Sequence, residues 1–233
     1  MENKKYELTS EIKTFNGIKL HRIKALIDFG DVKAGDLGGY IQDERNLSQT
    51  GKAWVKGNAL VNDNAVVGGN AVVRDNAVVT GNAWVEGNAT VYDNAVVSGD
   101  AWVKDDAVVK GNAVVTDNAW ISGNAVVESD TKVDGNAVVE SAAWIDGNAR
   151  VEGEAVVSSE ADYVYVKSLG LRGRYTSFFK QKDGSIGVVC GCFCGTLEEF
   201  RKKVKETHKN TKFAEEYLML ANLIEFHFNK ENK

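Results

Sequence analysis

An aliphatic residue recurs at every sixth position through the middle of the chain, from Val55 to Val157. The residue two positions earlier is small, and it is alanine in every hexad except the one that contains Thr131. Residues two apart on a strand share a face, so both positions are expected to point into a core. Eighteen hexads follow one another without an insertion, and a short repeat of fixed period is typical of a solenoid.

A turn pair separates these apolar positions, usually Gly or Asp followed by Asn, as in Gly57-Asn58 and Asp75-Asn76. Gly, Asp and Asn adopt left-handed backbone conformations at low cost, so each hexad is predicted to be a short strand followed by a corner of about 120°. Three hexads then close an 18-residue triangular coil. Six coils stacked at about 4.8 Å would form a prism roughly 29 Å long.

The position between alanine and valine in each hexad is expected to point outward. Chance would scatter large residues over the three faces, but the tryptophans recur at multiples of 18 residues. The first predicted column consists of Val66, Trp84, Trp102, Trp120, Val138 and Val156. The second consists of Trp54, Val72, Thr90, Val108, Val126 and Trp144. The third consists of Leu60, Val78, Val96, Val114, Lys132 and Arg150.

The two ends of such a prism expose unpaired strand edges, so the flanking segments are expected to cover them. Residues 1–50 are predicted to form an N-terminal β-hairpin cap and a partial first coil, with a tight turn at Asn16-Gly17. Residues 51–158 are the predicted β-helix. Residues 159–233, in which the hexad pattern is absent, are predicted to form a ββαα module that covers the last coil.

Turn and capping signals underlie the ββαα prediction. Two predicted strands, Tyr175–Gln181 and Ile186–Cys190, flank the hairpin turn Asp183-Gly184. Thr196 followed by Glu199 is a capping box that opens a helix. A second helix, which Asn210 or Thr211 caps, has apolar residues at helical spacing, namely Phe213, Tyr217, Leu220, Ala221, Ile224 and Phe228.

The repeat unit Val-x-Gly/Asp-Asn-Ala-x resembles that of the hexapeptide-repeat left-handed parallel β-helix superfamily, over about half of the chain. The flanking residues 36–48 and 195–200 resemble segments of phage and prophage accessory proteins that are often labelled transferases. The resemblance implies a mainly β protein: a left-handed β-helix of six 18-residue coils, with an N-terminal β-cap and a C-terminal ββαα cap.

Composition and charge limit the classes of function. No apolar stretch approaches the roughly 18 residues of a membrane span, and the charged N-terminus lacks the apolar segment of a signal peptide. We therefore expect a protein of the bacterial host's cytoplasm that does not bind membranes. Residues 51–158 carry 7 basic and 15 acidic side chains, and this acidic body argues against nucleic acid as a partner.

Catalysis is not expected. Many left-handed β-helix proteins are acyltransferases that use a histidine base and loops extruded from the coils. The three histidines, His21, His208 and His227, all lie outside residues 51–158, and no loop interrupts the hexads. A base within hydrogen-bond reach of the attacking group is therefore missing from the coils, and no cofactor is expected.

A metal site is also not expected, although three cysteines and a histidine can in principle form a zinc set. On an extended strand the sulfurs of alternating cysteines would lie about 6–7 Å apart, wider than a tetrahedral site requires. We interpret the cysteines as the end of a buried hairpin, where cysteine acts as a small hydrophobe. The candidate ligands are Cys190, Cys192, Cys194 and His208.

The first tryptophan column is interpreted as a contact surface. Stacked apolar residues on one outward face form a patch, and such patches mark association sites. We expect a homo-oligomer, most simply a trimer with its prism axes parallel, and the predicted interface is Val66, Trp84, Trp102, Trp120, Val138 and Val156. The alternatives are a surface for another partner or ligand, and aromatic stacking that only stiffens the sheet.

A candidate ligand site combines cations with aromatic faces near the C-terminal hairpin. Such a set can hold a phosphorylated nucleobase by stacking and charge-assisted hydrogen bonds. The alternative is that these residues decorate a solvated hairpin. The candidate residues are Tyr163, Tyr165, Arg172, Arg174, Tyr175 and Lys180.

These observations predict a non-catalytic binding protein of phage or prophage type. It is expected to bind a host protein or to sequester a small anionic, nucleotide-like ligand, as a counter-defence protein would. The alternative class is a structural one, a polymer-forming scaffold or an acidic decoy. The sequence does not identify the ligand or the partner.

Overall fold

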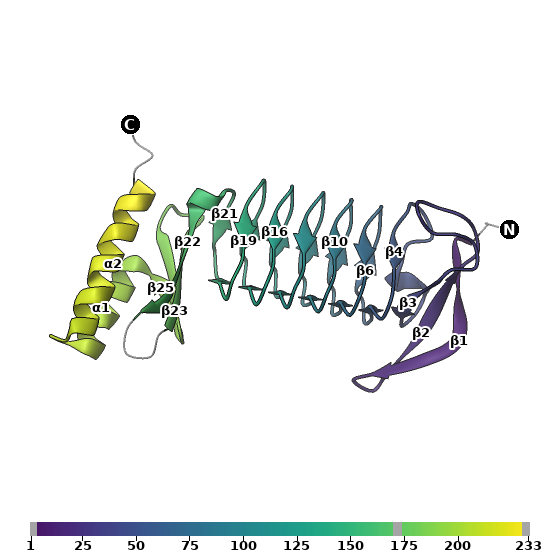
Figure 1. Ribbon diagram of the computed structural model, residues 1–233, viewed down its shortest axis with the longest axis horizontal. Helices are drawn as coiled ribbons and strands as arrows, with labels where there is room; N and C mark the ends of the chain where they lie inside the picture. The colour runs from purple at the N-terminus through teal and green to yellow at the C-terminus, as the bar shows by residue number, and fades with distance from the viewer. Residues whose placement is uncertain (1–3, 170–173, 230–233) are drawn as a thin grey trace.

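The computed structural model describes residues 4–169 and 174–229 of the chain. The molecule is elongated, with a stack of parallel coils at its centre, a β-hairpin at the N-terminal end and a sheet with two helices at the other end (Figure 1). The mainly β fold class and the parallel β-helix are therefore confirmed. The left-handed sense of the coil stays a prediction of the repeat.

The coils consist of strands two residues long, separated by corners. Within residues 51–158, all of which are described, every predicted hexad contributes one strand. The strands are Trp54–Val55 (β4), Leu60–Val61 (β5), Val66–Val67 (β6), Val72–Val73 (β7), Val78–Val79 (β8), Trp84–Val85 (β9), Thr90–Val91 (β10), Val96–Val97 (β11), Trp102–Val103 (β12), Val108–Val109 (β13), Val114–Val115 (β14), Trp120–Ile121 (β15), Val126–Val127 (β16), Lys132–Val133 (β17), Val138–Val139 (β18), Trp144–Ile145 (β19), Arg150–Val151 (β20) and Val156–Val157 (β21).

Each of these strands pairs in parallel with the strand three places along the chain, which confirms the 18-residue coil. Strand β12, for example, lies between β9 and β15, so Trp102 pairs with both Trp84 and Trp120. Three sheets result, with the coil strands in the orders β19-β16-β13-β10-β7-β4, β21-β18-β15-β12-β9-β6 and β5-β8-β11-β14-β17-β20, and the third sheet continues into the N-terminal cap. The three predicted columns are the outward positions of these three sheets.

The interior of the prism is a ladder of small and aliphatic side chains. The hexad alanines and valines from Ala53 to Val157 are fully buried, as is Thr131, whose hydroxyl donates to the Glu128 carbonyl 2.6 Å away. The corners use positive backbone dihedral angles, such as a φ of 59° at Asp117. Asp, Ser and Gly share these corner positions because they tolerate this conformation best.

The N-terminal cap extends one sheet of the prism instead of forming a separate layer. Strands β1 (Tyr6–Phe15) and β2 (Ile18–Ala25) form the predicted antiparallel hairpin, with the turn at Asn16-Gly17. Strand β2 pairs antiparallel with β3 (Leu37–Ile41), and β3 pairs in parallel with β5. Strand β3 therefore belongs to the predicted partial first coil.

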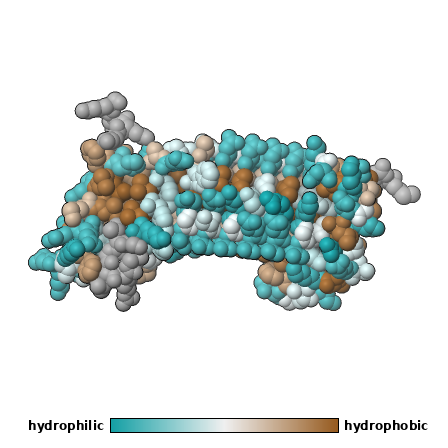
Figure 2. All heavy atoms as spheres, in the orientation of Figure 1, coloured by the Kyte–Doolittle hydropathy of each residue, from teal (hydrophilic) through white to brown (hydrophobic). Residues whose placement is uncertain are grey.

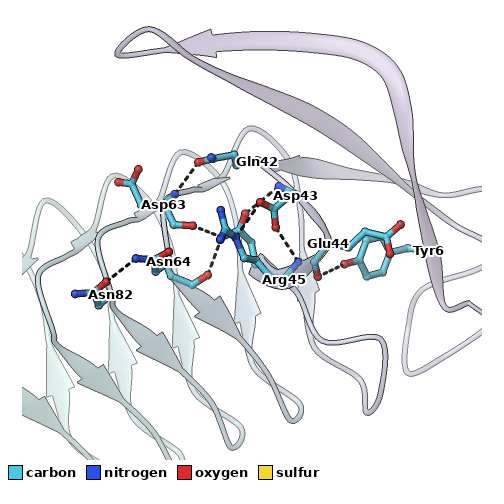
Figure 3. Close-up of polar contacts among 10 residues, drawn as sticks. Tyr6, Gln42, Asp43, Glu44, Arg45, Asp63, Asn64 and Asn82 are labelled. Carbon is cyan, nitrogen blue, oxygen red and sulfur yellow. Dashed lines mark hydrogen bonds and ion pairs between the residues drawn. The ribbon is translucent and has the colours of Figure 1, made fainter.

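Side chains satisfy the backbone groups that the first coil would otherwise leave unpaired. The short 3-10 helix η1 (Glu44–Asn46) places the Asn46 amide to donate to the carbonyls of Asp63 and Ala65, 3.1 and 2.8 Å away. The Gln42 side-chain oxygen accepts from the backbone N–H of Asp63 at 2.9 Å, as Figure 3 shows. The open strand edge that a bare solenoid would present is thereby occupied.

The C-terminal module contains four strands where the sequence predicted two. After the 3-10 helix η2 (Glu160–Asp162), strands β22 (Tyr163–Leu169), β23 (Arg174–Lys180), β24 (Ile186–Cys190) and β25 (Phe193–Thr196) form an antiparallel meander. Helices α1 (Leu197–His208) and α2 (Lys212–Phe228) follow. The alternation from Tyr163 to Val166 was not counted as a separate strand, and β25 was missed because it is only four residues long.

Capping residues define both helices as predicted. The Thr196 hydroxyl accepts from the backbone N–H of Glu199, whose carboxylate accepts in return from the N–H of Thr196. Thr211, not Asn210, caps α2. Neither helix of the described chain has the length and apolar character that crossing a bilayer requires.

The C-terminal sheet closes the second end of the prism. The Ser177 hydroxyl accepts from the backbone N–H of Arg150 at 3.0 Å, where a further coil would have offered a carbonyl. The backbone N–H of Lys182 donates to the Glu154 carbonyl at 3.0 Å, next to an antiparallel bridge between Ala155 and Gln181. Strand β23 is thus joined to the last coil by a side-chain hydrogen bond, and the residues that follow it are joined to that coil by a backbone hydrogen bond.

Candidate functional site

The first tryptophan column lies on the sheet formed by β6, β9, β12, β15, β18 and β21. The indole rings of Trp84 and Trp102 stack with centroids 5.3 Å apart and planes within 6°. Those of Trp102 and Trp120 stack at 5.4 Å and 8°. The predicted vertical alignment of the three side chains is therefore confirmed.

This stack is both rigid and accessible. Trp84 is 38% exposed, and Trp102 and Trp120 are half-buried. Each stacked pair contributes about 0.5–1.5 kcal/mol, so the rings are held in place before any partner binds. Among the described residues, no group accepts a hydrogen bond from the three indole N–H groups. We call this face, with Val66, Trp84, Trp102, Trp120, Val138 and Val156, the tryptophan face.

One cation lies on the tryptophan face. The Lys104 ammonium lies 4.5 Å from the centroid of the Trp120 ring, which is cation–π distance. Lys104 directly follows β12 in the chain. Hydrophobic rows on the β-helix are bordered by hydrophilic corner residues, as Figure 2 shows for one side of the molecule.

The two tryptophans at the ends of the second column differ in their exposure to solvent. The outward side chain of Trp54 is buried, because Tyr6 and Phe29 of the N-terminal cap pack edge-on against it at 6.3 and 5.4 Å. Trp144, five coils away, is 48% exposed, and its indole N–H donates to the Glu128 carboxylate at 2.8 Å. Stacked tryptophans are thus confined to the tryptophan face.

Glu128 connects Trp144 to a salt bridge on the second face. The Lys110 ammonium lies 2.7 Å from the Glu128 carboxylate. The hydrogen bond from Lys110 lowers the pKa of Glu128, and the bond from Trp144 acts in the same direction. This second face is therefore more polar than the tryptophan face, and its polar groups at Glu128, Lys110 and Trp144 bind one another.

The third column changes character along the prism. Leu60 is buried beneath the hairpin by Leu20 and Tyr40, and the valines that follow are half-buried. Lys132 and Arg150 end the column, and each forms an ion pair within its own coil, with Asp134 and Glu152 respectively.

The described members of the predicted ligand site make contacts within the chain. Lys180 forms an ion pair with Asp162 at 2.7 Å. Burial alone would raise the pKa of Asp162, but the Lys180 contact and backbone hydrogen bonds lower it overall. Arg172 lies outside the described residues, and so does the side chain of Arg174.

The tyrosines of the same predicted site lie between the C-terminal sheet and the last coil. Tyr165 and Tyr175 stack at 5.6 Å and 15°, and the Tyr165 hydroxyl accepts from the backbone N–H of Asn148 at 3.3 Å. The hydroxyl of Tyr163 is buried, and this burial raises its pKa. The edge of Tyr175, which is 39% exposed, is the part of this trio most open to a ligand.

The predicted metal ligands are separated by the hairpin turn between β24 and β25. Cys190 is buried and accepts from the Thr176 hydroxyl at 3.2 Å, whereas Cys192 and Cys194 are exposed. Burial and the neighbouring Glu152 raise the pKa of Cys194, which disfavours its thiolate. His208 packs against the Tyr217 ring at 5.7 Å. Within residues 4–169 and 174–229, no cluster of three potential metal ligands is present.

The fold defines a capped parallel β-helix protein, and the tryptophan face presents three stacked aromatic side chains on its surface. No protein-family model matches the sequence, and no curated protein is detected as a relative. The candidate function therefore depends on the surfaces of the chain itself.

Proposed function

We propose that this chain is a non-catalytic binding protein that assembles into a trimer through the tryptophan face. The observation that carries the proposal is the stack of Trp84, Trp102 and Trp120, which leaves aromatic surface in solvent on a regular face. Tryptophan is enriched in protein interfaces, and rings that are already ordered lose little entropy on binding.

A flat prism face suits a symmetric assembly. The column from Val66 to Val156 spans five strand spacings, or roughly 24 Å, and points in one direction along its whole length. Three copies with parallel axes can direct this face toward a common three-fold axis, which closes the assembly and covers all three stacks.

The absence of catalysis is part of the proposal. The coils contain no histidine and no inserted loop. His21 lies on β2, where its Nδ1 is 3.2 Å from the Thr9 carbonyl, and His208 and His227 lie on the C-terminal helices. Residues 51–158, which form the complete coils, therefore contribute no histidine that could act as the base for an acyl acceptor.

The setting that we propose is a phage or prophage accessory protein in the cytoplasm of its bacterial host. The repeat unit and the flanking segments support this setting by resemblance. We propose a host protein as the partner of the assembled trimer, since Lys180 is ion-paired and Tyr163 is buried in the region predicted to hold a small anion.

The test of the trimer is the solution mass of a Trp102→Ala variant, measured by light scattering after gel filtration. Trp102 is the middle ring, so its removal separates both stacked pairs, and we expect the mass to fall from three chains to one. Trp144→Ala is the matched control, because it removes an exposed tryptophan from the neighbouring face. An unchanged mass in Trp102→Ala, with the β-helix still folded by circular dichroism, contradicts the assignment.

A further inference from the structure

Two columns of residues border the tryptophan face, one along each side. Alternate residues of a strand share a face, so the residues two before and two after each outward position lie beside the tryptophan column. The leading edge, which precedes each strand, consists of Asn64, Asn82, Asp100, Asn118, Asn136 and Glu154, all of them exposed. The trailing edge, which follows each strand, consists of Gly68, Glu86, Lys104, Ser122, Glu140 and Ser158.

The coil that contains Trp102 carries opposite charges on its two edges. Asp100 lies on the leading edge and Lys104 lies on the trailing edge, and none of the other five coils of residues 51–158 has this combination on the tryptophan face. An extended segment of four residues spans roughly 13 Å, so the two groups lie on opposite sides of the face. A single copy of the chain therefore holds the two halves of an ion pair apart.

Neither charge is neutralised by an ion pair within the chain. The Asn82 amide donates to the Asp100 carboxylate at 2.7 Å, and within residues 4–169 and 174–229 no cation lies at salt-bridge distance from that carboxylate. The Lys104 ammonium lies over the Trp120 ring, and the same ranges provide no carboxylate within salt-bridge distance of it. A second copy of this chain presents the complementary charge to each of them.

We propose that neighbouring copies meet edge to edge and in register, so that Lys104 of each copy pairs with Asp100 of the next. This pairing rests on the trimer proposed above. A closed rotation includes no translation along its axis, so each coil lies level with the same coil of its neighbours. When the tryptophan faces are directed at the axis, the trailing edge of one copy meets the leading edge of the next. The ion pair is then formed three times around the axis.

The remaining coils are compatible with this register. A glutamate on the trailing edge meets an asparagine, whose amide has two donors, and a serine meets an asparagine or a glutamate. The pairs are Gly68 with Asn64, Glu86 with Asn82, Ser122 with Asn118, Glu140 with Asn136 and Ser158 with Glu154. No level sets like charges against each other.

Other arrangements of the same face lose this complementarity. A shift by one coil in one direction sets Glu86 against Asp100, and both are acidic. A shift in the other direction sets Lys104 against Asn82 instead of Asp100. Antiparallel pairing of two tryptophan faces brings leading edge to leading edge, so it does not join Lys104 to Asp100. The charges therefore favour the parallel arrangement in register.

The other two faces of the prism do not fit the same arrangement. On the second face, a parallel contact in register sets Lys52 against Lys56. On the third face, it sets Asp130 against Asp134. Like charges that face each other across an interface oppose association. The tryptophan face is thus the one of the three that joins opposite charges at one level and like charges at none.

The test is reversal of the two charges, with the solution mass measured by light scattering over a dilution series at low salt. Lys104→Glu sets acid against Asp100, and Asp100→Lys sets a second cation against Lys104. Each single variant should dissociate at a concentration higher than that of the wild type by at least about tenfold. The double variant Asp100→Lys/Lys104→Glu exchanges the charges and should return this concentration to the wild-type value. Unfolding of the single variants would not be reversed in this way.

Asp130→Lys is the matched control for Asp100→Lys. Asp130 is exposed and also accepts from the asparagine one coil earlier, since the Asn112 amide donates to it at 2.9 Å. It borders the third face, at the corner opposite the tryptophan face, so this variant should dissociate as the wild type does.

The possible results separate this pairing from the trimer itself. Single variants that dissociate as the wild type does, or a double variant that dissociates as they do, overturn the pairing. If Trp102→Ala is monomeric in the same experiment, the trimer through the tryptophan face stands without this ion pair. A wild-type chain that is monomeric at every concentration contradicts both proposals.

Discussion

The Lys5 ammonium donates a hydrogen bond to the backbone carbonyl of Ala53, 3.0 Å away, at the start of the first complete coil. Lys5 is almost fully buried, and its ammonium lies 5.2 Å from the centroid of the Phe29 ring. A charged side chain thus caps a strand edge of the prism from inside the N-terminal cap. This arrangement gives the stability of the protein a defined dependence on pH.

Burial lowers the pKa of Lys5 from 10.5 to about 8. Between these two values the unfolded chain binds more protons than the folded one, so the free energy of unfolding rises with pH. Below pH 8 both states are protonated and the cost of burying the charge is fully present. We expect wild type to gain about 2 kcal/mol relative to Lys5→Met between pH 7.5 and pH 10.

Urea unfolding of both chains at the two pH values measures this gain. The Lys5→Met variant is the internal reference, since every other titrating group is shared. A difference between the two chains that stays constant with pH, or shrinks, contradicts the assignment of a lowered pKa to Lys5.

Glycines at the corners are expected to differ in their tolerance of substitution. Gly99 and Gly153 have nearly equal φ values of 68° and 69°. A Cβ on Gly99 would lie 2.6 Å from the backbone nitrogen of Asp117 in the next coil, whereas a Cβ on Gly153 meets nothing within 4 Å. Gly153→Ala should cost about 1 kcal/mol of backbone strain. Gly99→Ala should cost at least 2 kcal/mol, because the neighbouring coil must also move. Thermal unfolding that ranks them equally contradicts this packing.

The asparagine ladders at the corners are expected to add measurable stability. The Asn94 side chain accepts from Asn76 at 3.3 Å and donates to Asn112 at 3.1 Å. Asn94→Ala should cost about 1 kcal/mol, since exposed hydrogen bonds contribute at the low end of the usual range. Asn58 occupies the same corner two coils earlier and makes no side-chain hydrogen bond within the described residues, so Asn58→Ala is the matched control. A melting temperature lowered equally by both substitutions argues against the ladder.

The β-helix could be predicted from sequence because each hexad repeats the same pattern of apolar and corner residues. The valine and alanine positions define the inward face, the corner residues permit positive φ, and the 18-residue period aligns Trp84, Trp102 and Trp120. A hexad that departs from the pattern, such as the one that contains Thr131, is still assigned correctly, because the hexads on either side fix the register of the coils. The 18-residue period was therefore sufficient to predict the tryptophan column.

The ends of the molecule could not be predicted to the same depth, because their contacts join residues far apart in the chain. The covering of Trp54 by Tyr6 depends on how the hairpin folds back onto the first coil. The pairing of Lys180 with Asp162 depends on the path of a four-stranded sheet of which only two strands were predicted.

The most direct test of the central claim is native mass spectrometry of the wild-type chain purified gently from cells. Assembly through the tryptophan face predicts a mass of three 25.4-kDa chains. A second species with added mass would identify a host protein carried by the trimer. A single monomeric species at every concentration tested would contradict the claim that the stacked tryptophans form an interface.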